Sequence, residues 1–311
     1  RTLDGVDIKL WANAESRDDV TEAHALGAAG VGLYRTEFLF MGSSELPDEE
    51  MQFRAYRDAV IAMTGRTVTI RTLDLGADKA DKTGLALRDE PNPALGLRGV
   101  RLSLAREGLL RTQLRAMARA SGYGPLRALV PMVSGYEEMR TVRTALDAVM
   151  FELRSEGYEV ADHLPLGAMI EVPSAAISLP GFIGLCDFLS IGTNDLVQYL
   201  LAADRTNEAL GELYSPLHPA VLRVLRDVVR VAARRDTPLA VCGEIAGDPL
   251  FVPLLLALGI GELSLHPATM LEVRRAIRGC DLSALRASTP ALLRARDRAG
   301  IEAWLKAHAA P

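Results

Sequence analysis

Five reactive side chains stand at the ends of short apolar segments of this 311-residue chain. The segments read VGLY before Arg35, TVTI before Arg71, LGAMI before Glu171, FLSIGTN before Asp195 and PLAV before Cys242. Guanidinium groups bind phosphate through paired hydrogen bonds, neighbouring carboxylates bind divalent cations, and a thiol can donate a proton. These residue types together favour chemistry on a phosphorylated carboxylic acid that is held with a divalent cation.

The apolar segments alternate with segments of helical periodicity, which is the pattern of a mostly parallel sheet. Several are continuous apolar runs, as in strands that are buried on both faces. We expect eight strands, at 7–13, 30–34, 67–72, 126–133, 165–172, 188–191, 238–241 and 262–265. The pattern predicts an α/β fold, a (β/α)8 TIM barrel, in which the carboxyl ends of the strands bring the reactive side chains to one rim.

Helical segments are expected between these strands, at 18–26, 48–63, 107–120, 136–155, 221–235, 249–258 and 268–278. A helical C-terminal tail over 291–309 should pack on the barrel or on a partner. The connection 74–98 is rich in Gly, Pro and Asp, and loops longer than about 15 residues are usually functional or disordered. This connection leaves the same predicted rim.

Composition narrows the class of protein. The chain is 49% hydrophobic and 24% charged, with a net charge of −5 and no basic tract, so neither nucleic acid nor an anionic membrane surface is an expected partner. No apolar run reaches the roughly 20 residues that span a bilayer, and the start RTLDGVDIKLW lacks the pattern of a signal peptide. Three separated cysteines fit a reduced protein. We expect a cytoplasmic chain that forms one barrel over 1–311.

The arginines allow two interpretations. Arg35 and Arg71 end consecutive predicted strands, so they can converge on one phosphate, but each can instead pair with a nearby acid such as Glu37 or Asp74. Arg205, in AADRTN, can reach back to a substrate carboxylate, and its spacing does not separate that role from that of an exposed surface arginine.

The two carboxylates should be neighbours on the rim, where they repel each other unless a cation intervenes. Mg²⁺ suits Glu171 and Asp195, since it takes one or two carboxylates and completes its shell with substrate oxygens and water. No Cys/His cluster supports zinc. Alternatively, Glu171 pairs with a core arginine and Asp195 caps the following helix, whose start at 192–194 can also donate N–H groups to an anion.

Cys242 also has two interpretations. A lone cysteine is most often a small buried apolar side chain. Its position at a strand end before Gly243 instead predicts exposure on the rim, where a thiol that is protonated at pH 7 can act as an acid. Cys186 and Cys280 lack such a position and are expected to be structural.

Longer motifs carry a family resemblance. GAAGVGLYRTEFLFM, RTLDLGADK, NPALGLRGVR, MIEVPSA, SIGTNDLVQYLLAADR and CGEIAGDP occur in this order. Over nearly its whole length the chain resembles the C-terminal phosphoenolpyruvate-binding domain of Enzyme I, the phosphoenolpyruvate–protein phosphotransferase of the bacterial sugar phosphotransferase system. The resemblance implies the following roles: phosphate binding by Arg35 and Arg71, Mg²⁺ ligation by Glu171 and Asp195, substrate contacts by Asn194 and Asp195, carboxylate binding by Arg205, and protonation of the enolate carbon by Cys242.

The resemblance also implies partners. Phosphoenolpyruvate would lose its phosphoryl group to a histidine of an N-terminal phosphohistidine domain, and through it to HPr, leaving pyruvate. The barrel would form a homodimer. No Gly-Gly-x-x-Ser-His loop occurs in 1–311, so we expect the phosphohistidine and HPr-binding domains to be absent from this chain.

Two motifs depart from the family pattern. Gly76-Ala77-Asp78-Lys79 stands where the family usually has Gly-Gly-Asp-Lys, and alanine adopts positive φ less readily than glycine. Ser264-Leu265-His266-Pro267 stands where Ser-Met-Ser or Ser-Met-Asn is common. His266 either alters the pH dependence or caps the next helix, and we favour the cap.

Two other functions remain open. The barrel of a pyruvate phosphate dikinase or phosphoenolpyruvate synthase is similar, and a nucleotide-binding domain upstream would indicate one of these. A non-catalytic dimerisation and phosphoenolpyruvate-sensing module is the second, and a mass that does not change with ligand would count against it.

Overall fold

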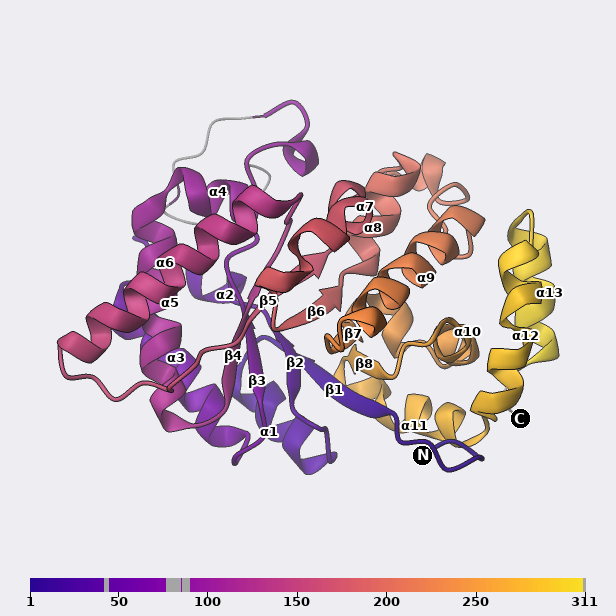
Figure 1. The fold of residues 1–311 in the computed structure, drawn as a ribbon, viewed down its shortest axis with the longest axis horizontal. Helices are drawn as coiled ribbons and strands as arrows, with labels where there is room; N and C mark the ends of the chain where they lie inside the picture. Colours follow the sequence, from indigo (N-terminus) through magenta and orange to yellow (C-terminus); the bar gives the residue numbers. More distant parts are fainter. Residues whose placement is uncertain (42–44, 77–84, 86–89, 310–311) are drawn as a thin grey trace.

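The computed structural model describes residues 1–41, 45–76, 85 and 90–309. Parallel strands close into a barrel in which each strand pairs with the next one in the chain and β8 pairs back to β1 (Figure 1). The strands are β1 (Lys9–Ala14), β2 (Val31–Tyr34), β3 (Val68–Arg71), β4 (Leu126–Val130), β5 (Leu166–Ile170), β6 (Phe188–Ile191), β7 (Leu239–Val241) and β8 (Glu262–Leu265). The predicted (β/α)8 TIM barrel is confirmed, and the predicted bounds of β6 and β8 are correct at both ends.

Helices surround this barrel (Figure 1). They are α1 (Arg17–Ala25), α2 (Glu37–Phe40), α3 (Glu49–Ala62), α4 (Val100–Ala105), α5 (Glu107–Ala120), α6 (Tyr136–Ser155), α7 (Pro173–Phe182), α8 (Thr193–Leu201), α9 (Pro219–Arg234), α10 (Val252–Leu258) and α11 (Met270–Arg278). The predicted helix at 249–258 is divided into a 3₁₀ turn, η7 (Pro249–Phe251), followed by α10. The predicted helix at 268–278 likewise follows a 3₁₀ turn, η8 (Pro267–Thr269).

Alternation along the strands divides the buried side chains into two groups. Outward-facing residues such as Val31 and Ile70 belong to the large core between barrel and helices. A separate cluster takes side chains from β2, β4, β5 and β6 and one that follows β7, and so fills the barrel interior: Leu33, Leu129, Met169, Phe188 and Cys242. This cluster forms an apolar base beneath the carboxyl ends of the strands.

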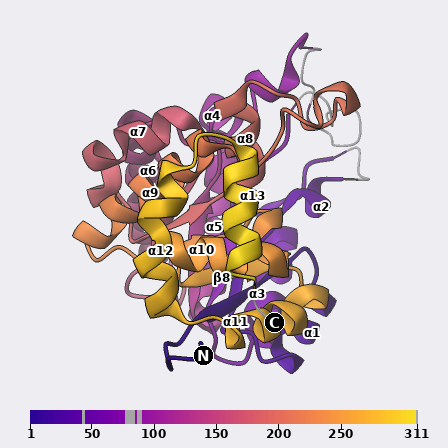
Figure 2. The same ribbon diagram turned by 90° about the vertical axis from the view of Figure 1, so that its right-hand side faces the viewer.

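The C-terminal tail consists of two helices, α12 (Leu282–Arg294) and α13 (Arg298–Ala307), which stand side by side on one flank of the barrel (Figure 2). The single helical segment predicted at 291–309 is therefore interrupted. Asp297 starts the second helix by accepting a hydrogen bond from the Gly300 N–H at 2.9 Å. The Thr289 hydroxyl donates to the Ala257 carbonyl of α10 at 2.8 Å, so the tail packs on the barrel. In the described chain, no helix is both long enough and apolar enough to cross a membrane.

Candidate active site at the carboxyl ends of the strands

A cavity of about 450 Å³ opens where the carboxyl ends of the strands meet their loops. It is lined by all seven residues that the sequence singled out for binding or catalysis: Arg35, Arg71, Glu171, Asn194, Asp195, Arg205 and Cys242. These residues come from five different strand ends or the loops and helix that follow them. The closed sheet therefore gathers side chains that are far apart in the chain around one space.

Arg71, the last residue of β3, is buried between acids. Its Nη2 lies 3.1 Å from Glu37 Oε1 and its Nη1 lies 3.1 Å from Asp74 Oδ2. Burial by itself lowers the pKa of Arg71, but the charges of Glu37, Asp74 and Glu171 outweigh burial and raise it above its ordinary value. The structure thus shows the ion pairs of the alternative interpretation, and it also places the same guanidinium at the cavity wall.

Arg35 and Arg205 are more exposed. Arg35 follows β2 and pairs with Glu15, with 2.8 Å between Nη1 and Oε1. Arg205 lies in the loop after α8, where its backbone N–H donates to Gln198 Oε1 at 3.1 Å. In the described chain no ion pair engages the Arg205 side chain, so its charge stays available at the mouth of the cavity.

Glu171 directly follows β5, and its side chain is buried. Oε1 accepts a hydrogen bond from the Met132 N–H at 2.6 Å, and Met132 has a φ of 58°, which is strained for a residue with a side chain. Burial, followed by the charges of Asp74 and Asp195, raises the pKa of Glu171 to about 8. Within the described residues no ion pair joins Glu171 to a core arginine, contrary to the alternative that the sequence left open.

Asp195 lies within the first turn of α8, which begins at Thr193 after the N-cap Gly192. The alternative that Asp195 caps this helix is therefore wrong. Its two carboxylate oxygens each lie 3.4 Å from a terminal nitrogen of Arg98. Asp195 thus faces the cavity as one half of an ion pair.

Asn194 is held by Glu244. Its Nδ2 donates to Glu244 Oε1 at 2.8 Å, and its Oδ1 accepts from the Glu244 N–H at 2.9 Å. The Asn194 carbonyl accepts from the Tyr214 hydroxyl at 2.9 Å. These three bonds fix the orientation of Asn194 at the cavity wall.

Cys242 lines the cavity but is only 4% exposed, so the predicted exposure on the rim is wrong. The residue follows β7 and belongs to the apolar cluster that fills the barrel interior. Burial raises the pKa of Cys242 to about 11, which keeps the thiol protonated at neutral pH. A protonated thiol is the form that the predicted acid role requires. Cys186 and Cys280 are also buried, as expected of structural residues.

Two glycines allow the walls of the cavity to approach each other. A Cβ on Gly192 would lie 2.5 Å from Glu171 Oε2, and a Cβ on Gly243 would lie 1.8 Å from Thr193 Oγ1. Any side chain at either position would displace a neighbour, since real contacts of this kind are longer. The close approach explains why glycine precedes α8 and follows Cys242.

The sequence reasoning missed Arg98 and Glu244 as site residues, and treated Asp74 only as a possible partner of an arginine. Arg98 is inside NPALGLRGVR, one of the motifs on which the family resemblance rests, so that motif was the available signal. Glu244 is likewise inside CGEIAGDP. Neither residue ends an apolar run, and the search by strand ends passed over both.

The two departures from the family pattern have different outcomes. Ala77, Asp78 and Lys79 lie outside the residues that the structure describes. His266 caps η8, because its Nδ1 accepts a hydrogen bond from the Ala268 N–H at 3.2 Å. It is not part of the cavity wall, which supports the capping interpretation.

The donor set of the cavity suits a hard cation. Among the described residues, no group of three His, Cys, Asp or Glu side chains is placed to hold a metal ion alone. Mg²⁺ needs only one or two protein carboxylates when substrate and water supply the remaining oxygens. Glu171 and Asp195 fit this requirement. Burial, followed by the charges of Asp74 and Asp195, raises the pKa of Glu171, and a bound cation would offset this repulsion between carboxylates.

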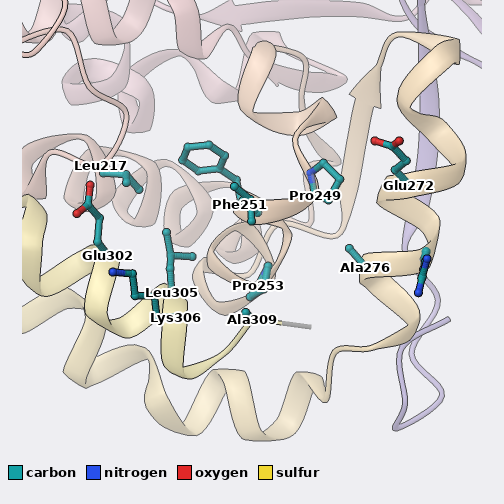
Figure 3. A pocket seen from close by; sticks show the side chains of 12 residues that line it. Leu217, Pro249, Phe251, Pro253, Glu272, Ala276, Glu302, Leu305, Lys306 and Ala309 are labelled. Atoms are coloured by element: carbon teal, nitrogen blue, oxygen red, sulfur yellow. The ribbon is translucent and has the colours of Figure 1, made fainter. Parts of the chain in front are cut away.

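A second, larger hollow of about 630 Å³ lies between the tail and the barrel (Figure 3). Its wall is mainly apolar and includes Leu217, Phe251, Pro253 and Leu305, which Figure 3 shows around the space. Charged side chains such as Glu302 and Lys306 are also present, but no set of buried charges comparable to that at the strand ends lines it. The larger volume of this hollow therefore does not make it the candidate active site. The buried charged residues identify the cavity at the strand ends instead.

A (β/α)8 barrel whose strand ends gather arginines, buried carboxylates and a thiol around one cavity has the arrangement in which barrel enzymes place their active sites. Residues 1–282 match the sequence profile of the family described as "PEP-utilising enzyme, PEP-binding domain". The chain belongs to this family of phosphoenolpyruvate-utilising enzymes.

Curated relatives carry the name phosphoenolpyruvate-protein phosphotransferase. The proteins from Cupriavidus necator, Geobacillus stearothermophilus and Staphylococcus aureus are 50%, 46% and 44% identical to this chain over 278, 277 and 278 residues. These matches cover 89% of this chain and 47% to 48% of the relatives. The chain thus spans about half the length of the curated relatives that it matches.

Solved structures with low sequence identity share the fold. A citrate lyase from Burkholderia xenovorans matches with a TM-score of 0.54 and 15% identity, over 98% of this chain and 94% of that chain. The malate synthase of Haloferax volcanii, solved as a ternary complex with pyruvate and acetyl-CoA, matches with a TM-score of 0.58 and 11% identity, over 88% of this chain and 70% of that chain. At these identities the likeness concerns the barrel fold alone.

Proposed function

We propose that this chain binds phosphoenolpyruvate together with Mg²⁺ in the cavity at the strand ends, and supports transfer of the phosphoryl group to a histidine of another domain. The observation that carries the proposal is the meeting of arginines, buried carboxylates and a protonated thiol in one cavity of about 450 Å³. The names of the curated relatives favour this transfer over the dikinase and synthase reactions.

The arginines would hold the phosphate. A phosphoryl group in transfer carries negative charge on its outer oxygens, and fixed positive groups stabilise that charge without reorganising. Arg71 is already positioned by Glu37 and Asp74, while Arg35 stands on the neighbouring strand end. Arg205, exposed at the mouth, would pair with the substrate carboxylate, and Asn194, held by Glu244, would donate to the substrate oxygens.

Glu171 and Asp195 would hold the Mg²⁺ ion, which would neutralise charge on the phosphate and carboxylate oxygens when bound. The two residues differ in their present partners. Glu171 is oriented by the Met132 N–H, whereas Asp195 faces Arg98. The fixed position of Glu171 would define one side of the ion's shell.

Cys242 would complete the reaction. When the phosphoryl group leaves the enol oxygen for the histidine nitrogen, the remaining enolate must gain a proton at its terminal carbon to become pyruvate. The buried thiol has a raised pKa of about 11 and so still carries its proton at neutral pH. Cys242 would act as the general acid, becoming a thiolate that the neighbouring Arg71 charge stabilises.

The activity of the longer relatives implies further partners. The phosphoryl acceptor would be the histidine of an N-terminal domain, HPr would receive the group from it, and the barrel would pair with a second copy as a homodimer. The acceptor histidine, HPr and the homodimer are what the family resemblance implies, and the name of the curated relatives supports only a protein acceptor of the phosphoryl group.

Calorimetric titration with phosphoenolpyruvate, with and without Mg²⁺, tests the proposed function. Heat of binding that requires Arg71 and increases with Mg²⁺ is expected. The absence of binding under both conditions, in a chain that circular dichroism shows to be folded, would reject the proposal.

A second experiment tests Cys242. Cys242→Ala should bind phosphoenolpyruvate normally but lose the incorporation of solvent protons into the methyl group of pyruvate, once the chain is combined with its histidine domain. Cys186→Ala is the matched control, because Cys186 is also buried but does not line the cavity. Undiminished proton incorporation in Cys242→Ala would remove the acid role.

A further inference from the structure

Arg98 occupies a position between two carboxylates of the cavity. Its Nη2 lies 3.1 Å and 3.0 Å from the two oxygens of Asp74, and its Nε lies 3.2 Å from Asp74 Oδ1. On the other side, Nη1 and Nη2 each lie 3.4 Å from one oxygen of Asp195. One guanidinium therefore spans both acids, with the shorter contacts on Asp74.

Tyr199 supports this arrangement from α8. Its hydroxyl accepts a hydrogen bond from Arg98 Nη1 at 3.2 Å and donates to the Ala94 carbonyl. The side chains of Arg98, Asp195 and Asp74 are only 15%, 10% and 4% exposed, so water screens their charges little. The contact between Arg98 and Asp195 is thus a strong electrostatic feature of the cavity without ligand.

We propose that Arg98 is a place-holding cation, which neutralises Asp195 until a metal ion arrives and must then release it. The inference rests on the proposed function, because it takes Asp195 as a ligand of the metal. Arg98 acts here as a positioning residue. Its longer contacts, those to Asp195, are the ones that break, while its shorter contacts to Asp74 persist.

Competition for the same oxygens is the physical reason. Both oxygens of Asp195 face nitrogens of Arg98, and an approaching divalent cation is repelled by that guanidinium while it competes for the same lone pairs. A substrate anion changes the balance, because its negative charge can compensate Arg98 after Asp195 is released. Metal alone should therefore bind weakly, and metal with phosphoenolpyruvate should bind tightly.

The test is a titration with Mn²⁺ in the absence of substrate, followed by electron paramagnetic resonance of the free ion. Arg98→Gln should bind Mn²⁺ about tenfold more tightly than the wild type, because the repelling charge is removed and a neutral amide competes less for the Asp195 oxygens. Arg98→Lys keeps the positive charge and should stay within about threefold of the wild type. An Arg98→Gln affinity equal to or weaker than that of the wild type overturns the inference.

Arg35→Gln is the matched control for a general loss of positive charge at the cavity. Arg35 lines the same cavity but pairs with Glu15 and touches neither Glu171 nor Asp195. Its removal should leave the Mn²⁺ affinity within about threefold of the wild type. An equal gain in Arg35→Gln and Arg98→Gln would show a nonspecific charge effect and reject the place-holding role.

Two further variants keep the inference open to refutation. If Arg98→Gln does not fold, as judged by circular dichroism, Tyr199→Phe is measured instead, because it removes a hydrogen bond that holds Arg98. It should strengthen Mn²⁺ binding about two- to threefold, and no change counts against the proposal. Adding Asp195→Asn to Arg98→Gln should abolish the gain, and a gain that persists would place the metal elsewhere.

The wild type separates failure of this inference from failure of the proposed function. If phosphoenolpyruvate and Mn²⁺ do not bind together in the wild type, the proposed function is wrong, and the inference falls with it. If they bind together but Arg98→Gln binds Mn²⁺ alone no better than the wild type, the inference about Arg98 alone is rejected.

Discussion

The two ends of the barrel bury guanidinium groups in different ways. At the carboxyl ends of the strands, Arg71 and Arg98 lie among carboxylates. At the opposite end, Arg127 near the start of β4 lies between aromatic rings, with Cζ 4.7 Å from the ring centroid of Trp11 and 4.1 Å from that of Phe188. No ion pair involves Arg127 in the described part of the chain.

The pKa values reflect this difference. Acids raise the pKa of Arg71 despite burial, whereas burial lowers the pKa of Arg127 to about 10. A guanidinium that is paired with carboxylates can exchange them for a phosphate, which is also an anion, and a carboxylate can exchange the guanidinium for a metal cation. A guanidinium that is stacked on aromatic rings has no paired carboxylate that it could exchange for another anion. We call the carboxyl ends of the strands, with Arg71 and Arg98, the rearrangeable end of the barrel, and the opposite end, with Arg127, the structural end.

The largest expected effect comes from Arg71. Arg71→Gln should weaken phosphoenolpyruvate binding more than about 100-fold, because it removes a buried charge and the guanidinium that pairs with Glu37, while Asp74 keeps its pair with Arg98. Calorimetry at constant ionic strength measures this loss. Arg127→Gln is the control from the opposite end and should bind within about twofold of the wild type. Equal losses in both variants would erase the distinction between the two ends.

The next effect concerns pH at the rearrangeable end. The pKa of Glu171 is about 8 in the folded chain, above its ordinary 4.5, so the folded state holds a proton that the unfolded state has lost. The free energy of unfolding should therefore fall between roughly pH 5 and 8, by at most about 1.4 kcal/mol per pH unit. Urea denaturation across this range, without metal or substrate, measures the slope.

Glu171→Gln is the matched variant for this measurement. It should lose the Glu171 contribution to the slope and be more stable than the wild type at pH 8, since no buried carboxylate then ionises. The same variant should bind Mg²⁺ with phosphoenolpyruvate poorly. An identical pH dependence in both proteins would contradict the raised pKa.

A smaller effect is expected at the structural end. Arg127→Met should lower the free energy of unfolding by about 1–2 kcal/mol, because it removes the stacking on Trp11 and Phe188 and the bond from Nε to Thr69 Oγ1 at 2.6 Å. Chemical denaturation gives the loss, and calorimetry should give an unchanged affinity for phosphoenolpyruvate. A loss of affinity without a loss of stability would assign Arg127 to the site instead.

The smallest effect on stability belongs to Arg205. Its side chain is exposed, so Arg205→Gln should change the free energy of unfolding by less than about 0.5 kcal/mol. Affinity for phosphoenolpyruvate should still fall about tenfold, with a weaker dependence on salt than in the wild type. Titrations at low and high ionic strength distinguish this from a purely structural change.

Most of the barrel could be predicted, because its strands are continuous apolar runs and its helices have a polar face. The helix α7 was missed, since its sequence PSAAISLPGF contains Pro180 and Gly181, which disfavour a helix, and has no charged side chain to mark an outer face. The sequence predicts the tail as one helical segment, because 291–309 contains no glycine or proline near Ala295, where the chain leaves α12. Local composition therefore predicted where most strands and helices lie, but not where a helical segment is interrupted.

The same limit applies to the site: residues at strand ends could be predicted, and contacts between different strand ends could not. Residues that end or directly follow a strand, such as Arg71 and Glu171, were found because their position follows from the strand itself. Arg98 was not found, since its partners Asp74 and Asp195 are brought to it by two different strand ends. The burial of Cys242 was also missed, because it depends on side chains from four other strands in the barrel interior.

By itself, the sequence determined which residues form strands and which side chains stand at their carboxyl ends, because apolar periodicity acts over a few neighbouring residues. Only the tertiary structure decided which charges meet. An ion pair depends on separations of a few ångströms between groups such as Arg98 and Asp195, and the closure of β8 on β1 together with the packing of the loops sets those separations.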